Sequence, residues 1–515
     1  NCFSSGLRGP HVVLVACDFA RSCSSVPLMF VWALLGQARR DSARQDGTVI
    51  MLIVRRGGLA QAASGIALAL VMMPWSGASA ESLRSEVEGL LGDHPQIRAA
   101  ESAVVAGTEG ERRERAGYLP TVTGTAGAGY EHTDSLATRA AGQDNVQFFA
   151  TNATLEVRQN VFNGFGTRSG VRSAGALTRA AEETLTAVTQ NVVLEAVTTY
   201  MNVLRNRELV RLNRGNERAI QEQLQLEDER VQRGSGIAVD VLEAKSRLQI
   251  AREQSVTLQG ALKDTVANYV QVFGHAPVLD EMRAVTPAQE SLPATKEEGI
   301  ALIQKGNPVI QIAQAQVSSA MHERERAAST YWPSLDVVAR ANIENNLSGV
   351  EDVRHDYSVK LEARWVLFDG LLTPANTGAA AARYQEAIQN GRNVTRKTIE
   401  LMEIAWHQME VADERADLLR NAMNIAAEVF ASRLELREAG KETAINVLDA
   451  QSQLYNACIN FVNAVFDSEI AAYRVLNTLG ELDRGAVANS EPVEQSTVVE
   501  QCGFKAGKDE YRVGD

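Results

Sequence analysis

The sequence contains a long internal repeat, which constrains the fold more than any single motif does. His94-Pro95 is matched by Asn307-Pro308, and Tyr118-Leu119-Pro120 is matched by Tyr331-Trp332-Pro333. Both matches lie 213 positions apart. Such a repeat indicates two copies of one structural unit, which bury their apolar surfaces against each other.

The repeat continues with a different offset further along the chain. Phe162-Asn163-Gly164 is matched by Phe368-Asp369-Gly370, 206 positions later, and residues 242–248 are matched by residues 448–454. The change of seven positions therefore falls between residues 120 and 162. Because loops at a solvent-facing end tolerate changes of length, we expect an exposed loop in that interval.

Each half is predicted to contain a helix of about 25 residues, two strands, a very long helix, a break marked by glycine and a second long helix. Proline, which interrupts helices, is absent between Pro120 and Pro277 and between Pro374 and Pro492. A single helix over residues 166–233 would extend for about 100 Å. An ordinary globular domain rarely needs a helix of that length.

The long helices carry heptad spacing, which is typical of coiled-coil packing. One column of the second repeat is apolar at every seventh position, with Met402, Met409, Ala416, Met423 and Phe430. A second column holds small residues that let helix backbones approach closely, namely Ala450, Ala457, Ala464 and Ala471. We predict that both columns lie in the core between helices and build walls rather than a reactive site.

The segments after the two Tyr-x-Pro motifs alternate apolar and polar residues with a period of two, which predicts strands. Strands of about ten residues with charges on one face suit a transmembrane barrel with a water-filled lumen. The residues expected to face that lumen are Glu156, Arg158, Arg340, Glu344, Lys360, Glu362 and Arg364. The alternative is an antiparallel sheet with one wet face. Four strands cannot close a barrel, which needs at least about eight, so a barrel would require more than one chain.

The region before residue 81 is expected to be absent from the mature protein. Residues 51–80 combine a basic start, an apolar stretch and the small-residue sequence Ala78-Ser79-Ala80, which together are typical of a secretory signal peptide. The apolar stretch is shorter than the ~20 residues of a membrane-spanning helix. Residues 1–50 resemble nothing that follows, and we interpret them as a non-native upstream extension.

These features together resemble the TolC-like outer membrane efflux protein family over nearly all of residues 81–485. The resemblance is carried by the duplicated proline segments, by Leu367-Phe368-Asp369-Gly370, and by residues 446–450 followed by residues 454–457. Each motif is weak alone. In this order, duplicated and combined with these helix lengths, they are specific to the family.

The resemblance implies a mainly α fold with a transmembrane β part, in which long coiled-coil helices form a helical barrel. It implies a homotrimer whose three chains each give four strands to one 12-strand β-barrel. It also implies a location in the cell outer membrane, in contact with lipid, with a helical tunnel in the periplasm. The expected partners are a periplasmic adaptor and an inner-membrane pump, either ABC-type or proton-driven. Such a duct is passive, so we expect no catalytic residue, cofactor or metal.

The periplasmic entrance is expected at the two breaks, residues 234–236 and 440–442, and at the helices that follow them. The residues assigned to this entrance are Asp449, Asn446, Glu442, Lys441, Arg437, Asp240 and Glu243. The family has a basic residue where this chain has Glu442, so Lys441 or Arg437 is expected to supply the missing link, towards Asp240 or Glu243. The alternative is that Asp449 and Glu243 are solvated residues near a helix start, where the helix dipole favours them.

The chain is expected to contain two repeats, a connector between them and a polar tail. The first repeat spans 81–275, with strands at about 121–130 and 148–162 and helices at about 166–233 and 237–274. An equatorial connector covers 276–305. The second repeat spans 306–482, with strands at about 334–344 and 355–368 and helices at about 375–439 and 444–480. A polar tail follows at 483–515.

Several other functions are disfavoured by the sequence. A net charge of −13 gives no basic surface for nucleic acid. The segment Gly164–Gly170 is one residue too long for a nucleotide-binding glycine motif and is interpreted as a junction, and the histidines show no metal spacing. A periplasmic coiled-coil adaptor remains an alternative, but it would have one helical hairpin. An exported hydrolase would need a nucleophile, a base and an acid, and no such set is found. The cargo, a secreted protein or a drug, is left open.

Overall fold

The structure is a computed structural model that describes residues 83–492, apart from 141, 143–144, 284, 288–290, 350, 483 and 489–490. These residues belong to one compact unit, Ser76–Asp515. The expected upstream extension, the expected signal peptide and the part of the expected polar tail after residue 492 lie outside the described residues.

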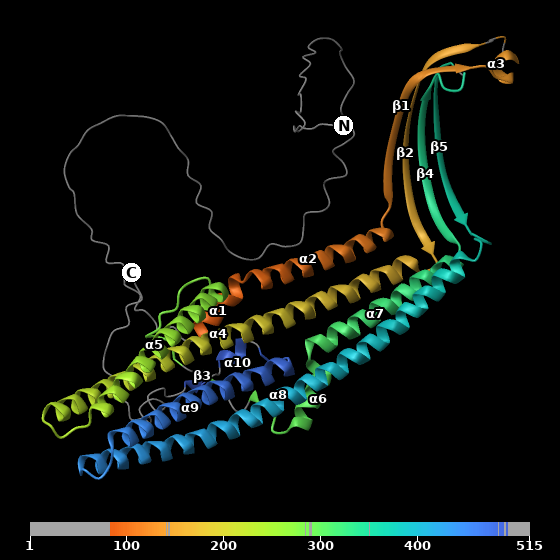
Figure 1. Ribbon diagram of the computed structural model, residues 1–515. Coiled ribbons are helices and arrows are strands. Elements are labelled where there is room, and N and C mark those ends of the chain that lie inside the picture. The colour runs from red at the N-terminus through yellow and green to blue at the C-terminus, as the bar shows by residue number, and fades with distance from the viewer. Residues whose placement is uncertain are drawn as a thin grey trace, which may run out of the picture. The chain divides into compact units, whose positions relative to one another are not determined.

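The two repeats contain the same elements in the same order, which confirms the predicted duplication (Figure 1). The first repeat consists of α1 (Leu83–Asp93), α2 (Pro95–Arg115), β1 (Thr121–Thr133), β2 (Val146–Asn163), α4 (Gly166–Gln232) and α5 (Ala238–Phe273). The second consists of α6 (Lys296–Gly306), α7 (Pro308–Ala328), β4 (Ser334–Asn345), β5 (Val353–Arg364), α8 (Leu372–Glu438) and α9 (Ala444–Leu479). The smaller elements are η1 (Ala116–Tyr118), α3 (Leu136–Ala140), β3 (Val285–Thr286), η3 (Ser329–Tyr331), α10 (Arg484–Ala488) and β6 (Glu491–Pro492).

Corresponding helices have equal lengths in the two repeats. Both α4 and α8 contain 67 residues, and both α5 and α9 contain 36. Two details differ from the expected elements. Short helices α1 and α6 precede the prolines, and β5 ends at Arg364 instead of continuing to Phe368. The chain must turn there, because Gly370 and Leu371 adopt positive φ angles of 68° and 69° directly before α8.

The junction between β2 and α4 explains the glycine-rich segment of the first repeat. Gly164 has φ 64°, and a Cβ atom added to it would lie 2.3 Å from the backbone oxygen of Ser329. Only glycine fits a backbone that is both left-handed and this close to another chain segment. Phe165, with φ 68°, then precedes α4 as Leu371 precedes α8. The structure therefore confirms a junction here.

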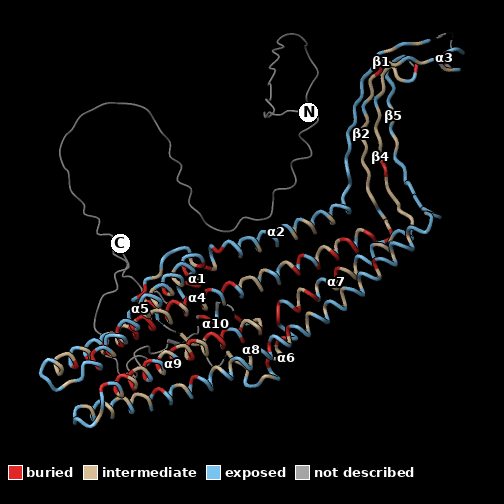
Figure 2. Tube along the Cα trace, viewed as in Figure 1, coloured by how far each residue is buried: buried red, intermediate tan, exposed pale blue. Residues whose placement is uncertain are grey.

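The core lies between the long helices, where buried residues gather along facing sides (Figure 2). Tyr200, Tyr269 and Tyr473 are fully buried at its centre and come from α4, α5 and α9. The predicted heptad columns are part of this packing, because Met402, Met423 and Ala464 are buried, and Phe430 packs against the cluster that contains Met423. Thus α8 and α9 associate through positions that the heptad columns indicated, and α4 and α5 also pack against each other.

The strands form one antiparallel sheet in the order β1-β2-β4-β5. The register of β2 against β4 shifts between Asn160 and Phe162, where Val161 forms a bulge. The bulge places Phe162 opposite Leu335, so apolar residues continue on one face to the end of the strand. Among the described residues, β1 and β5 each pair on one side only.

Candidate functional site

The sheet has one face that carries large apolar side chains in contact with solvent. In the register, Leu155 lies beside Ala341, and Ala341 lies beside Tyr357 on β5. Tyr357 is 78% exposed, and Val359 on the same face is 76% exposed. Within the described part of the chain, these side chains are left open to solvent. A contiguous apolar face of this kind indicates contact with lipid or with another chain.

The opposite face carries a network of charged side chains. The Glu156 carboxylate on β2 accepts a hydrogen bond of 3.1 Å from Arg340 Nε on β4 and another of 3.1 Å from Arg158 Nη2. Arg158 also lies 3.5 Å from the Glu362 carboxylate and 3.7 Å from that of Asp336. The network therefore joins β2, β4 and β5 through alternating charges, as cross-strand pairs do in a stable sheet.

The seven strand residues that were expected to face a lumen share this charged face of the sheet. Glu156, Arg158, Arg340 and Glu362 meet in the network, together with Asp336, which the assigned set omitted. Lys360 and Arg364 alternate with Ser358 and Glu362 at every second position of β5, and Glu344 is opposite Arg354 in the register. These three residues therefore share the face without joining the central network.

A second charged region lies at the ends of the long helices, where α4 turns into α5 and α8 turns into α9. Thr443 caps α9 by accepting a hydrogen bond of 3.4 Å from the backbone nitrogen of Asn446. The Glu442 carboxylate accepts hydrogen bonds from the Asn446 side chain and from the backbone nitrogen of Thr443, and Arg433 lies 3.2 Å away. These donors, Asn446 first, hold the pKa of Glu442 below its usual range.

Arg437 joins the end of α8 to the end of α4. Its Nη2 atom donates to both Glu227 oxygens, at 2.6 Å and 2.7 Å, and its Nη1 atom donates to the Glu442 backbone oxygen at 2.9 Å. Glu227 is 1% exposed and also accepts hydrogen bonds from Arg230 and Gln223. Buried charges of this kind require such compensation.

Within this chain, the expected pairing of Arg437 with Asp240 or Glu243 is wrong. Glu227 on the last turns of α4 faces α8, whereas Asp240 is buried in the first turn of α5. Lys441 is exposed in the turn after α8, and its backbone nitrogen donates to the Leu436 oxygen. Glu227 was not identified from the sequence. A position-by-position comparison of the repeats could have drawn attention to Glu227. The matched residue, 206 positions later, is Arg433, which carries the opposite charge.

Asp449 and Glu243 are brought together by a residue that the sequence analysis did not single out. Arg247 lies 2.5 Å from the Asp449 carboxylate and 3.2 Å from the Glu243 carboxylate. Asp449 is therefore not simply a solvated residue near a helix start. Asp449 and Glu243 belong to one charged group shared between α5 and α9.

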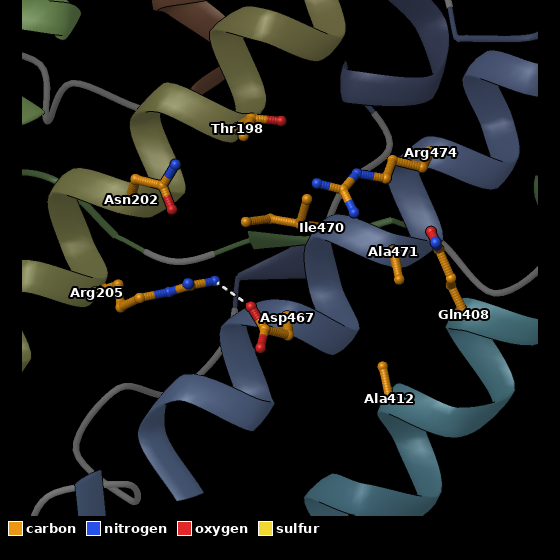
Figure 3. A pocket seen from close by; sticks show the side chains of 9 residues that line it. All are labelled: Thr198, Asn202, Arg205, Gln408, Ala412, Asp467, Ile470, Ala471 and Arg474. Atoms are coloured by element: carbon orange, nitrogen blue, oxygen red, sulfur yellow. Dashed lines mark hydrogen bonds and ion pairs between the residues drawn. The ribbon is translucent and has the colours of Figure 1, made fainter. Parts of the chain in front are cut away.

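A polar cavity of about 380 Å³ opens between α4, α8 and α9 (Figure 3). Arg205 of α4 and Asp467 of α9 form an ion pair of 2.7 Å across it, and Gln408 and Arg474 extend along its wall. The cavity contains no nucleophile paired with a base. In the described part of the chain, no group of three or more histidine, cysteine, aspartate or glutamate side chains could hold a metal.

Glu469 of α9 is a partly buried carboxylic acid near this cavity. Burial raises its pKa to about 7, Asp413 raises it further, and a hydrogen bond with Thr286 of β3 partly opposes the rise. Because the folded-state pKa is raised, protonated Glu469 favours the fold below the ordinary pKa of 4.5. This contribution is lost as the pH rises towards 7.

We predict that Glu469→Gln removes this pH dependence. The variant should unfold at a higher temperature than the parent above pH 7, by the equivalent of roughly 2 kcal/mol, and at a similar temperature at pH 4.5. Thermal unfolding in detergent across this range measures the difference. Glu410→Gln, at an exposed position of α8, is the control and should show no comparable change of stability with pH. A parent–variant difference that is the same at all pH values would contradict the raised pKa.

None of the described helices combines the length and apolar character needed to cross a membrane. The observed combination is a duplicated pair of long helical hairpins joined to a sheet with one apolar and one charged face. The family model described as outer membrane efflux protein matches residues 87–275 and 299–481. The chain therefore belongs to the outer membrane efflux protein family, as the resemblance predicted.

Individual relatives agree with this assignment. The chain is 24% identical to the outer membrane efflux protein BepC of Brucella suis over 456 residues, covering 87% of this chain and 95% of that protein. It is 26% identical to the protease secretion protein PrtF of Dickeya chrysanthemi, covering 76% and 86%. The solved structure of the outer membrane protein VceC from Vibrio cholerae superposes with a TM-score of 0.67 at 16% identity, covering 77% and 96%. The last comparison shows a shared fold.

Proposed function

We propose that this chain is one subunit of a passive exit duct, which carries the cargo of an export system across the periplasm and the outer membrane. The two-faced sheet is the observation that supports this most strongly. Its apolar face suits lipid, and its charged face, centred on Glu156, Arg158 and Arg340, suits a water-filled lumen. The long helices that continue from the sheet provide the wall of the tunnel.

The open edges of the sheet support assembly from several copies. In the described residues, β1 and β5 each have one unpaired edge, and unpaired backbone groups cannot remain in the hydrocarbon of a membrane. Pairing β5 of one copy with β1 of the next satisfies both edges. Three copies of a four-stranded sheet close a homotrimeric 12-strand barrel, as family resemblance implies, and one copy is too small to close.

The far ends of the long helices suit the partners that the family resemblance implies. The ends near Glu442 and Asp449 lie farthest along α4 and α8 from the sheet, so an entrance there faces away from the outer membrane (Figure 1). A periplasmic adaptor and an inner-membrane pump, ABC-type or proton-driven, would engage this end. In this proposal specificity resides in the pump, and the duct provides no catalytic group, cofactor or metal.

Cell fractionation tests the proposal against the alternatives. We expect the protein in the outer-membrane fraction, as a trimer that resists detergent and dissociates only on heating. A periplasmic adaptor would have one helical hairpin between β domains, whereas this chain has two hairpins, α4–α5 and α8–α9. Recovery of a monomer in the soluble periplasmic fraction would contradict the duct and favour an adaptor or an exported enzyme.

The loops between paired strands are predicted to lie at the cell surface. These are the loop after β1, which includes Gly142, and the shorter loop between Asn345 and Val353. An epitope inserted at Gly142 should be labelled on intact cells. The same epitope placed at Gly234, in the turn after α4, should be labelled only after the outer membrane is opened. The reverse pattern would show that the orientation is wrong.

Two kinds of cargo remain compatible with the family, since PrtF is named for secretion of proteases and BepC for efflux. A deletion strain distinguishes them. Loss of a secreted protein with unchanged drug sensitivity would indicate protein secretion. Increased drug sensitivity with normal secretion would indicate efflux.

A further inference from the structure

The two carboxylates at the helix ends occupy equivalent positions in the two repeats. Asp449 lies 206 positions after Glu243, which is the offset that relates α5 to α9. The residue equivalent to Arg247 is Gln453, which is neutral. The repeat therefore supplies two carboxylates but only one arginine at these matched positions.

The arginine binds both carboxylates and the neighbouring helix. Arg247 Nε lies 3.2 Å from Glu243 on its own helix, α5, and Nη2 lies 2.5 Å from Asp449 on α9. Its Nη1 atom donates to Ser452 Oγ at 3.1 Å and to the Leu448 backbone oxygen at 3.4 Å. All three guanidinium nitrogens are therefore engaged, and most of these contacts join α5 to α9.

The burial of the three side chains differs. The Arg247 side chain is 20% exposed, whereas Glu243 and Asp449 are 41% and 48% exposed. The arginine is held between the helices while the carboxylates reach solvent. Each carboxylate thus keeps an exposed charge beside a less exposed cation, which weakens the field that an arriving ion meets.

We propose that Arg247 is a specificity-determining residue of the entrance, which offsets the charge of Glu243 and Asp449 and fastens α5 to α9. This inference rests on the proposed function, because it concerns ions that enter the duct. It predicts that the parent channel binds multivalent cations only weakly at this end. It also predicts that separation of α5 from α9 requires the Arg247–Asp449 pair to break.

The test is Arg247→Gln, which gives the first repeat the residue already present in the second. Purified trimers in planar bilayers are exposed to hexaamminecobalt(III) from the side of the helix ends. We expect the half-blocking concentration to fall by about tenfold and the cation preference in a KCl gradient to increase, because each chain loses one compensating charge. Arg247→Lys, which keeps the charge, should restore most of the parent behaviour.

Arg252→Gln is the matched control, because it removes the same charge from the same helix. Arg252 lies 3.2 Å from Glu217 of α4 and touches neither carboxylate. The concentration of hexaamminecobalt(III) that blocks half of the Arg252→Gln current should stay within about twofold of the parent value. Equal effects of the two variants would overturn the inference, since they would show a general effect of net charge.

Asp449→Asn provides a second test that does not require removal of Arg247. It should raise the half-blocking concentration, and in Arg247→Gln it should reverse most of the tenfold decrease. If Arg247→Gln forms channels with parent block and selectivity, the inference is wrong while the duct stands. If the parent protein forms no channel, the proposed function itself fails.

Discussion

Replacement of Arg437 with glutamine is expected to open the duct more strongly than any other single change at the helix ends. Arg437 holds the Glu227 carboxylate, which is 1% exposed, so its loss leaves a buried charge with only Arg230 and Gln223 as partners. Breaking a buried pair in this way costs about 3 kcal/mol. The substitution destabilises the conformation in which α8 contacts α4. Movement of the α8–α9 hairpin away from the α4–α5 hairpin must break the Arg437–Glu227 pair, so the substitution makes this movement easier.

Single-channel recording measures the effect directly. We expect Arg437→Gln to raise the fraction of time spent in high-conductance states by about a hundredfold at most, and to sensitise cells to large antibiotics through leakage. Arg433→Gln is the control, since Arg433 is more exposed and bonds to Glu442 at 3.2 Å. It should change the same quantity only a few-fold. Parent-like conductance in Arg437→Gln would show that the entrance is closed elsewhere.

A charge placed on the apolar face of the sheet is expected to prevent assembly in the membrane. Leu155→Arg directs a cation to the face that carries Tyr357 and Val359, at a cost of about 2–4 kcal/mol per chain near the middle of the bilayer. In a homotrimer every copy carries this cost. The heat-modifiable trimer should therefore be lost from the outer-membrane fraction.

The neighbouring position supplies a matched control. Thr154 points to the opposite face of β2, two residues from Glu156, so Thr154→Arg adds the same charge where carboxylates already lie. We expect this variant to assemble at nearly the parent level and to alter ion preference instead. Assembly of both variants at the parent level would show that neither face contacts lipid.

The order of the elements could be predicted because the same sequence signals occur in both repeats. Proline-free spans and heptad columns indicated α4 and α8 to within a few residues, and the two-residue period indicated which side chains share a face of the sheet. The end of β5 was placed too late because Trp365–Phe368 is apolar like a strand. The strand ends at Arg364 because β4 begins at Ser334, directly after Pro333, so the residues after Arg364 have no partner on β4.

The contacts at the helix ends could not be predicted in the same way. The carboxylates Glu243 and Asp449 were identified from their spacing, but their partner Arg247 was not, and Arg437 was assigned to the wrong acids. Such pairs join helices that are more than 200 positions apart, and their choice depends on the rotation of each helix about its axis. That rotation is set by packing around the core, and the heptad spacing alone does not determine it.

Conductance of the purified protein in planar lipid bilayers tests the proposed duct most directly. The protein, extracted as a trimer from the outer membrane, should insert and give discrete, long-lived current steps without ATP or any cofactor. A folded trimer that repeatedly fails to conduct, in the parent and in Arg437→Gln alike, would contradict a passive channel built from this chain.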